Sequence, residues 1–258
     1  MNFPALKIAE CKPAPQIAGT PRPKMNLTLP RNRDWFYITI GLVVTAIVFL
    51  GFARTYYLKA WFDTGPLTAR LHLHGFALSA WLVLFLIQTG LIAAHRRTLH
   101  MRLGIAGAIL AAIAVMTTYA AGFEAAAHGR AQNQLTAFSR LYSTIELATL
   151  FGLFVAGGIV FRKRPEIHKR LMILAMLAVV GPGAHRAVVL IAGHFMHDPH
   201  ILVIAILLAG CLIYEWRTRG APHPVLLWGG ALLIGLQLTR QLIGGSNLWQ
   251  HIASWLLN

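Results

Sequence analysis

The stretch LTARLHLHGFALSAWLVLFLIQTG, residues 67–90, decides the fold class of this chain. After Arg70 it carries no acidic or basic residue other than histidine, and about 20 such residues in a helix cross the ~30 Å hydrocarbon core of a bilayer. The whole chain is similar in character: 57% of its 258 residues are hydrophobic, 12% are charged, and its mean hydropathy is +0.60. Too little polar sequence remains to cover a soluble domain. The sequence therefore predicts an integral membrane protein.

Comparable apolar windows recur along the chain and predict an all-α, polytopic membrane protein with seven transmembrane helices. The windows are residues 35–54, 67–94, 102–122, 135–161, 168–191, 200–216 and 222–243. They form a predicted transmembrane domain at 35–258, preceded by a tail at 1–34 that holds six of the 12 prolines. The tail has no apolar run of signal-peptide length, so we predict a basic cytoplasmic segment that is disordered or extended. It could dock on other membrane subunits or only set the topology.

Basic residues predict the orientation in the membrane. Of the 23 Lys and Arg residues, 16 fall in the segment before the first window and in three alternate loops. The positive-inside bias places this side in the cytoplasm, which predicts a bacterial inner-membrane protein with its N-terminus cytoplasmic and its C-terminus periplasmic. The loops at 55–66, 123–134 and 192–199 then face outward. The net charge of +15 is expected to contact anionic lipid head groups, and not nucleic acid, because the basic residues lie at helix ends.

Three of the predicted cytoplasmic turns repeat one phrase. RRTLHMRLG at 96–104 and RPEIHKRLM at 164–172 share the pattern Arg-x-x-x-His-x-Arg-Leu, and a fainter copy surrounds His223. The predicted architecture is therefore one leading helix followed by three helical hairpins, arranged as parallel repeats. We interpret His100, His168 and His223 as turn residues that satisfy unpaired backbone groups at helix starts. Roles as ligands or in proton handling are the alternative.

Histidines near the outer end of window 67–94 point in two directions. His74 shares one polar and aromatic face of the predicted helix with Trp81, Phe85 and Gln88. Residues two apart on a helix point about 200° away from each other, so His72 is expected to meet another helix or the interface. We predict that the face of His74 is turned toward the bundle interior.

Other polar residues at a similar depth predict an outward-facing pocket. They are Glu146, His185, Arg186, Gln237 and Arg240. The run Gly181-Pro182-Gly183 is expected to interrupt its helix and turn His185 inward. Ionisable groups within a bilayer usually face the bundle and mark functional sites. Alternatively, Glu146 pairs with an arginine as a structural contact while Arg240 and His72 reach the interface.

Neutral imidazoles on facing helices are the usual axial ligands of a membrane haem b, and they also bind transition metals. We therefore predict a haem b or transition-metal site shared by His74 and His185. Arg186 and Arg240 would neutralise haem propionates or an anionic ligand, and Glu146 would position them. The candidate metal ligands are His72, His74 and His185; the candidate cofactor-binding residues are His74, His185, Arg186, Arg240 and Glu146, with His100 and His168 as a second possible pair that would complete an electron path. The segment GHFMHDPH at 193–200 is expected to be a solvated loop, with metal binding as its alternative.

Several phrases carry a resemblance to a known group of proteins. They are DWFYITIGLVV (34–44), ARTYYLKAWF (53–62), HLHGFALSAWLVLFLIQTGLI (72–92), LHMRLGIAGA (99–108), EIHKRLMILAM (166–176) and HPVLLWGG (223–230). Over residues 34–258 the chain resembles a widespread, uncharacterised family of seven-helix bacterial inner-membrane proteins, which implies a fold and no activity. A looser similarity to transmembrane b-type cytochromes, based on histidines near helix ends, would imply electron transfer through haem.

Three classes of function fit these observations. The first is a haem- or metal-binding redox protein, and the second is a cofactor-free accessory or assembly subunit of a larger membrane complex. The third is a transporter or binder of an anionic or quinone-like small molecule. No nucleotide-binding loop, nucleophile elbow or HExxH metal motif is present to assign an enzymatic activity.

Overall fold

The computed structural model describes residues 32–194 and 198–257, and all the regular structure in these ranges is helical. Its elements are α1 (Asn32–Phe52), the π-helical turn η1 (Ala53–Tyr57), the 3-10 turn η2 (Lys59–Trp61), α2 (Ala69–Ala93), α3 (Arg97–Val160), α4 (Pro165–Ala192), α5 (Pro199–Arg219), α6 (Pro224–Gly244) and α7 (Asn247–Leu257). The predicted all-α class is confirmed. The tail predicted at residues 1–34 lies, as far as residue 31, outside the described residues.

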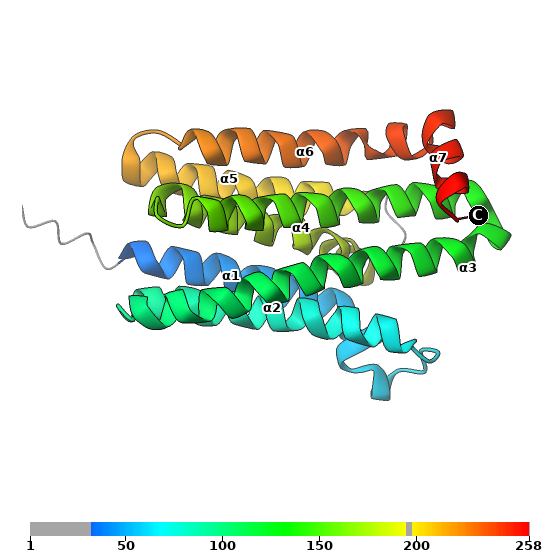
Figure 1. Ribbon diagram of the computed structural model, residues 1–258, viewed down its shortest axis with the longest axis horizontal. Coiled ribbons are helices and arrows are strands. Elements are labelled where there is room, and N and C mark those ends of the chain that lie inside the picture. Colours follow the sequence, from blue (N-terminus) through cyan, green and yellow to red (C-terminus); the bar gives the residue numbers. More distant parts are fainter. Residues whose placement is uncertain (1–31, 195–197, 258) are drawn as a thin grey trace, which may run out of the picture. The chain divides into compact units, whose positions relative to one another are not determined.

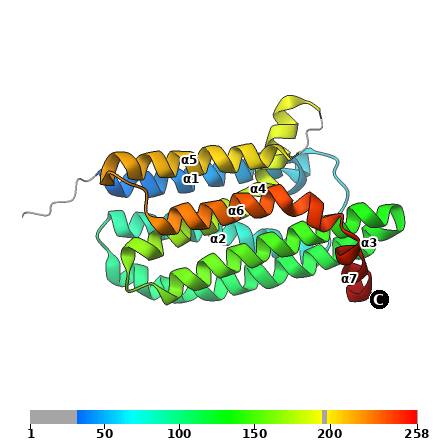
Figure 2. The same ribbon diagram turned by 90° about the horizontal axis from the view of Figure 1, so that it is seen from above.

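Six helical segments in the described ranges are long and apolar enough to cross a membrane. They are Trp35–Tyr57, Ala69–Ala93, Arg97–Val160, Pro165–Ala192, Pro199–Arg219 and Pro224–Gly244. Figures 1 and 2 show these segments running side by side along one direction. The chain therefore has the architecture of a polytopic membrane protein.

The long helix α3 folds back on itself and accounts for two of the predicted windows. Its backbone leaves the helical region only at Asn133 (φ −155°, ψ 98°), and Figure 1 shows the two arms running back alongside each other. The Tyr119 hydroxyl on the first arm lies 2.9 Å from the Thr149 hydroxyl on the second. The Asn133 side chain accepts a hydrogen bond from the Thr136 N–H, which caps the second arm.

The loop predicted at 123–134 is therefore wrong, since all of it except Asn133 is helical in backbone conformation. The reason is composition. The segment FEAAAHGRAQ at 123–132 contains four alanines, which have the highest helix propensity, so the helix continues past the end of the apolar window.

A short C-terminal helix, α7, was not predicted because its 11 residues cannot cross a bilayer. It lies beside the fold of α3 (Figure 1) and packs against both arms. Ala253 is fully buried there among Ala126, Ala137 and Phe138. The Trp249 indole donates a hydrogen bond to the Phe138 carbonyl at 2.7 Å.

Helix α4 lies at the centre of the bundle, in contact with α1, α3, α5 and α6. Residues Leu174 to Ala178 are completely buried on every side of the helix. A helix on the rim of a membrane bundle would instead expose one apolar face to lipid. Contrary to prediction, Gly181-Pro182-Gly183 does not break α4, which stays helical from Pro165 to Ala192. Instead, Gly183 faces Gly51 of α1, and the two backbones meet where neither residue has a side chain.

Exposed tryptophans gather at the two ends of the bundle. Trp35, Trp216 and Trp228 lie at the end that carries the α5–α6 turn, and Trp61 and Trp255 lie at the opposite end, with 60–78% of each residue exposed. Tryptophan is enriched at both membrane–water interfaces. The positions of these side chains fit a bilayer that spans the length of the bundle.

The contact between α1 and α4 gives the first prediction. A methyl group added by Gly51→Ala would overlap the Gly183 backbone, so this change should lower the free energy of unfolding by about 1–3 kcal/mol. Gly210→Ala on α5 is the control, because a methyl group there meets no atom within 4 Å. Thermal unfolding of the purified protein in detergent measures both. Equal stability of the two variants would contradict the close approach of α1 and α4.

Candidate functional site

At the end of the bundle where α5 begins, two imidazoles from neighbouring helices lie together. The ring centres of His185 on α4 and His200 on α5 are 5.9 Å apart, and His200 is 2% exposed. The sequence analysis counted His200 both as the start of the helical window 200–216 and as the end of a solvated loop at 193–200. Asp198 and Pro199 instead begin α5, because proline is favoured at the first helical position, and His200 therefore lies on a helix that faces the bundle. His197, from the same predicted loop, lies outside the described residues.

A chain of polar contacts leads from His200 toward the surface at this end of the bundle. The His200 Nε2 is 3.2 Å from Oε1 of Gln237 on α6, and Gln237 is 1% exposed. The Arg240 guanidinium lies 3.5 Å from the same Gln237 oxygen and forms an ion pair with Asp198. The amide of Gln241 also donates to Asp198, at 3.3 Å. These contacts join α5 to α6 and neutralise Arg240 within the protein.

Glu146 on the second arm of α3 lies close enough to Arg240 for their charges to interact. It is 7% exposed, and neither carboxylate oxygen has a hydrogen-bond partner in the described part of the chain. The ion pair that Arg240 makes is with Asp198. The interpretation of Glu146 as one half of a structural ion pair therefore finds no support in residues 32–194 and 198–257.

Arg186 follows His185 on α4 but turns toward α1. Its guanidinium lies 4.5 Å from the centre of the Phe52 ring and donates a hydrogen bond to the Pro182 carbonyl at 3.2 Å. A cation over an aromatic face is stabilised by the ring quadrupole. Arg186 thus helps to hold the C-terminal ends of α1 and α4 together.

His74 does not join His185. Its Nδ1 lies 3.4 Å from the Thr118 hydroxyl on α3. Helix α2 packs mainly against α1 and α3, whereas α4 packs mainly against α1, α3, α5 and α6. The described contacts of His74 and His185 are with different partners, and the site predicted to be shared by them stays a prediction.

The face of α2 that was predicted to point into the bundle is nevertheless correct. Trp81 and Phe85, on the face of His74, are buried, and Trp81 packs edge-on against Phe151 of α3 with ring centres 5.0 Å apart. His72 is exposed, and its ring centre is 6.1 Å from that of Tyr56. Within the described residues no three His, Cys, Asp or Glu side chains gather as a metal-ion site, so the candidate ligands His72, His74 and His185 form no such group.

At the opposite end, the histidines of the first two repeats meet. The ring centres of His100 on α3 and His168 on α4 are 6.1 Å apart, with the rings at 85° to each other. The His168 Nδ1 is 2.8 Å from the Gly158 carbonyl oxygen, so Nδ1 carries the proton of this hydrogen bond. The Nδ1 of His100 is buried without a partner among the described residues. The repetition therefore brings two imidazoles together as well as shaping the turns.

His223, the histidine of the third repeat, has the predicted role of satisfying a backbone N–H group at the start of a helix. The Nδ1 of His223 accepts a hydrogen bond from the Val225 N–H and caps α6. Only a neutral imidazole with a free Nδ1 lone pair can accept this bond. Burial, together with the charge of Arg170, lowers the pKa of His223 and favours that form.

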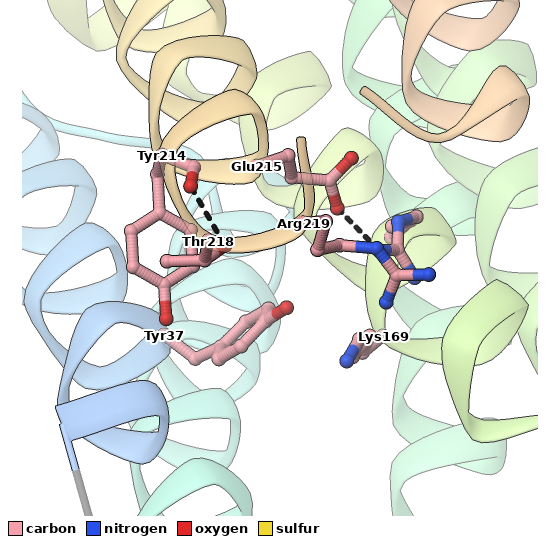
Figure 3. Close-up of a pocket in the computed structure, with 7 residues that line it drawn as sticks. Tyr37, Lys169, Tyr214, Glu215, Thr218 and Arg219 are labelled. Atoms are coloured by element: carbon pink, nitrogen blue, oxygen red, sulfur yellow. Dashed lines mark hydrogen bonds and ion pairs between the residues drawn. The ribbon is translucent and has the colours of Figure 1, made fainter. Parts of the chain in front are cut away.

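The same end also contains a buried ion-pair network that sequence reasoning missed. Arg170 is 1% exposed and pairs with Glu166 at 2.8 Å and with Glu215 of α5 at 2.5 Å. Glu166 also pairs with Lys169 and Arg219. Figure 3 shows Tyr37 and Glu215 beside a small cavity of about 10 Å³, room for about one water molecule. The chain has only eight acidic residues, so each one next to a predicted membrane helix was a candidate partner for a basic residue. This was the signal in the sequence that could have indicated the network.

Comparisons with protein families, with curated proteins and with solved structures found no match to this chain. The resemblance to a seven-helix inner-membrane family stays a prediction.

The network around Arg170 gives the second prediction. Arg170→Ala leaves Glu215 buried without its cation, which should lower the free energy of unfolding by about 3–5 kcal/mol. Arg102→Ala is a matched control, because Arg102 holds the same place in the first repeat but is exposed. Chemical or thermal unfolding in detergent measures the difference. If both variants are equally stable, Arg170 does not hold α4 to α5.

Proposed function

We propose that this protein is an inner-membrane electron carrier that holds haem b between paired imidazoles. The observation that carries the proposal is the pair of imidazole contacts, His100 with His168 and His185 with His200, toward opposite ends of α4. The ring centres are 6.1 Å apart in the first pair and 5.9 Å apart in the second, so the two imidazoles of each pair would hold one haem iron between them.

The donor set favours haem over a bare metal ion. Zinc and similar ions take three or four protein ligands, whereas the porphyrin supplies four of the six ligands of haem iron and two histidines complete the set. Haem would supply reversible one-electron chemistry when bound. His168 could present its Nε2 and His200 its buried Nδ1, because the other nitrogen of each ring already contacts a protein oxygen.

The spacing along α4 suits transfer across the membrane. His168 and His185 are 17 residues apart (185 − 168), which is about 25 Å at 1.5 Å per residue and close to the ~30 Å thickness of the hydrocarbon core. Arg186 lies next to His185 on α4 and would supply positive charge near the propionates, whereas Arg240 on α6 is already paired with Asp198. In this proposal Glu146 contributes a carboxyl group near Arg240.

We further infer seven membrane crossings, with the two arms of α3 as separate crossings. An odd number puts the two chain ends on opposite sides, and the basic turns put the N-terminus in the cytoplasm. One leading helix and three hairpins in the same orientation follow from this count. The basic end would contact anionic head groups, and the tail could still dock on a partner subunit.

The haem proposal predicts a spectrum. Protein purified from a haem-producing host should show a Soret band that shifts on reduction with dithionite, with two haems per chain by pyridine haemochrome assay. His185→Ala and His200→Ala should each remove one haem, and His100→Ala and His168→Ala the other. His72→Ala and His251→Ala, at exposed histidines, should retain both.

A colourless wild-type protein would sink the redox proposal. If such a protein also purified with stoichiometric partners, the accessory-subunit function would replace it. Loss of haem from His72→Ala alone would move the site to α2.

The topology predicts a second, independent result. A reporter active only in the periplasm should be active after Asn258 and inactive within 162–166, the turn between α3 and α4. Reporter activity at 128–132 should match that after Asn258, because the fold of α3 would lie outside. The reverse pattern would overturn the orientation.

A further inference from the structure

The two arms of α3 enclose a cleft near their fold at Asn133. Its volume is about 230 Å³, and its walls include Ala125, Gly129, Gln132, Asn133, Thr136 and Arg140. Small residues leave the space open, and the side chains of Ala125 and Thr136 at its rim are exposed. The cleft is smaller than the pockets of about 300 Å³ or more that hold drug-sized ligands. It can take a small group and is too small for haem.

The polar side chains of the cleft can donate hydrogen bonds. Gln132 and Asn133 carry amide NH2 groups, and Thr136 carries a hydroxyl. The Asn133 side-chain oxygen is already used by the Thr136 N–H, so its NH2 group is the part left for a ligand. No acidic residue lines the cleft.

Arg140 is the one cation among the residues that line the cleft, and its charge is not balanced nearby. In the described ranges, no carboxylate lies within the 4.0 Å ion-pair distance of its guanidinium. Its charge also acts unfavourably on Arg186 and His185 of α4. A negative charge placed in the cleft would offset this repulsion.

We propose that the cleft of α3 is a binding site for a small phosphate or carboxylate group. Arg140 supplies the charge, and the amides of Gln132 and Asn133 and the Thr136 hydroxyl supply neutral donors. Charge-assisted hydrogen bonds from arginine to such anions are shorter and stronger than neutral ones. The anion comes either from solution or from a phospholipid head group, and the site does not depend on haem.

Protection of a cysteine in the cleft tests the site. In a Cys11→Ser background, where the remaining Cys211 is buried, Ala125→Cys places a thiol in the cleft wall. Ala127→Cys is the matched control, because Ala127 is exposed on the same arm and points about 200° away. The rate of maleimide labelling is measured in detergent with inorganic phosphate, and in nanodiscs of phosphatidylcholine with or without phosphatidylglycerol.

Inorganic phosphate or phosphatidylglycerol should slow labelling of Ala125→Cys by about tenfold at saturation and leave Ala127→Cys unchanged. Adding Arg140→Gln should raise the half-protecting concentration about tenfold or more, the size expected for one charge-assisted hydrogen bond. Arg102→Gln removes an exposed positive charge at the far end of the first arm and should change nothing. Thermal stabilisation of the unlabelled protein by phosphate should likewise be lost in Arg140→Gln.

Protection by phosphate in detergent identifies a soluble anion, whereas protection only with phosphatidylglycerol identifies a head group. Labelling that is equal under all conditions overturns the proposal. So does protection that survives Arg140→Gln or that occurs equally at Ala127→Cys. A colourless protein that still shows protection refutes the haem proposal alone.

Discussion

The close approach of α1 and α4 is the contact on which the rest of the bundle depends. Gly51 and Gly183 let two backbones meet without side chains between them, and this places α4 against four other helices. A hydrophobic driving force between helices is weak in lipid, so tight packing of small residues has to supply much of the association. Because α4 is held at the centre, His168 and His185 both lie inside the bundle rim, each opposite an imidazole from another helix.

Polar side chains in the bilayer then fix the neighbours of α4. At one end Arg170 and Glu215 join α4 to α5, and at the other Arg240 and Asp198 join α6 to the start of α5. A charge that loses its partner in hydrocarbon is costly, so each pair permits few other arrangements of the two helices. Glu146 differs from these pairs, since neither of its oxygens is satisfied by the described residues, and groups of this kind usually have a ligand, water or proton as partner.

The sequence was sufficient for what depends on length and periodicity. Apolar windows located the long helices, the alternation of faces placed Trp81 and Phe85 inside, and the repeated phrase singled out His100 and His168, which the fold brings together. The sequence did not show which helices pack against each other. His74 and His185 have similar depth, but α2 packs mainly against α1 and α3. His200 opens a predicted helical window, yet it was assigned to a loop because the segment before it is polar. The turn between the arms of α3 was predicted, but its helical conformation was not, because a hydropathy window ends where the lipid ends, whereas an alanine-rich helix continues.

The fold of α3 through one non-helical residue has a consequence for how this chain can change. From Gln134 to Glu146 the second arm is continuous helix, so the cleft wall and the buried carboxylate have a fixed rotation relative to each other about the helix axis. Each residue added to that stretch rotates everything beyond it by about 100°. A single insertion would swing Glu146 out of the bundle, whereas three or four residues, about one turn, would nearly restore its direction and lengthen the arm by roughly 5 Å. Length variation in this arm is therefore expected in steps of a helical turn.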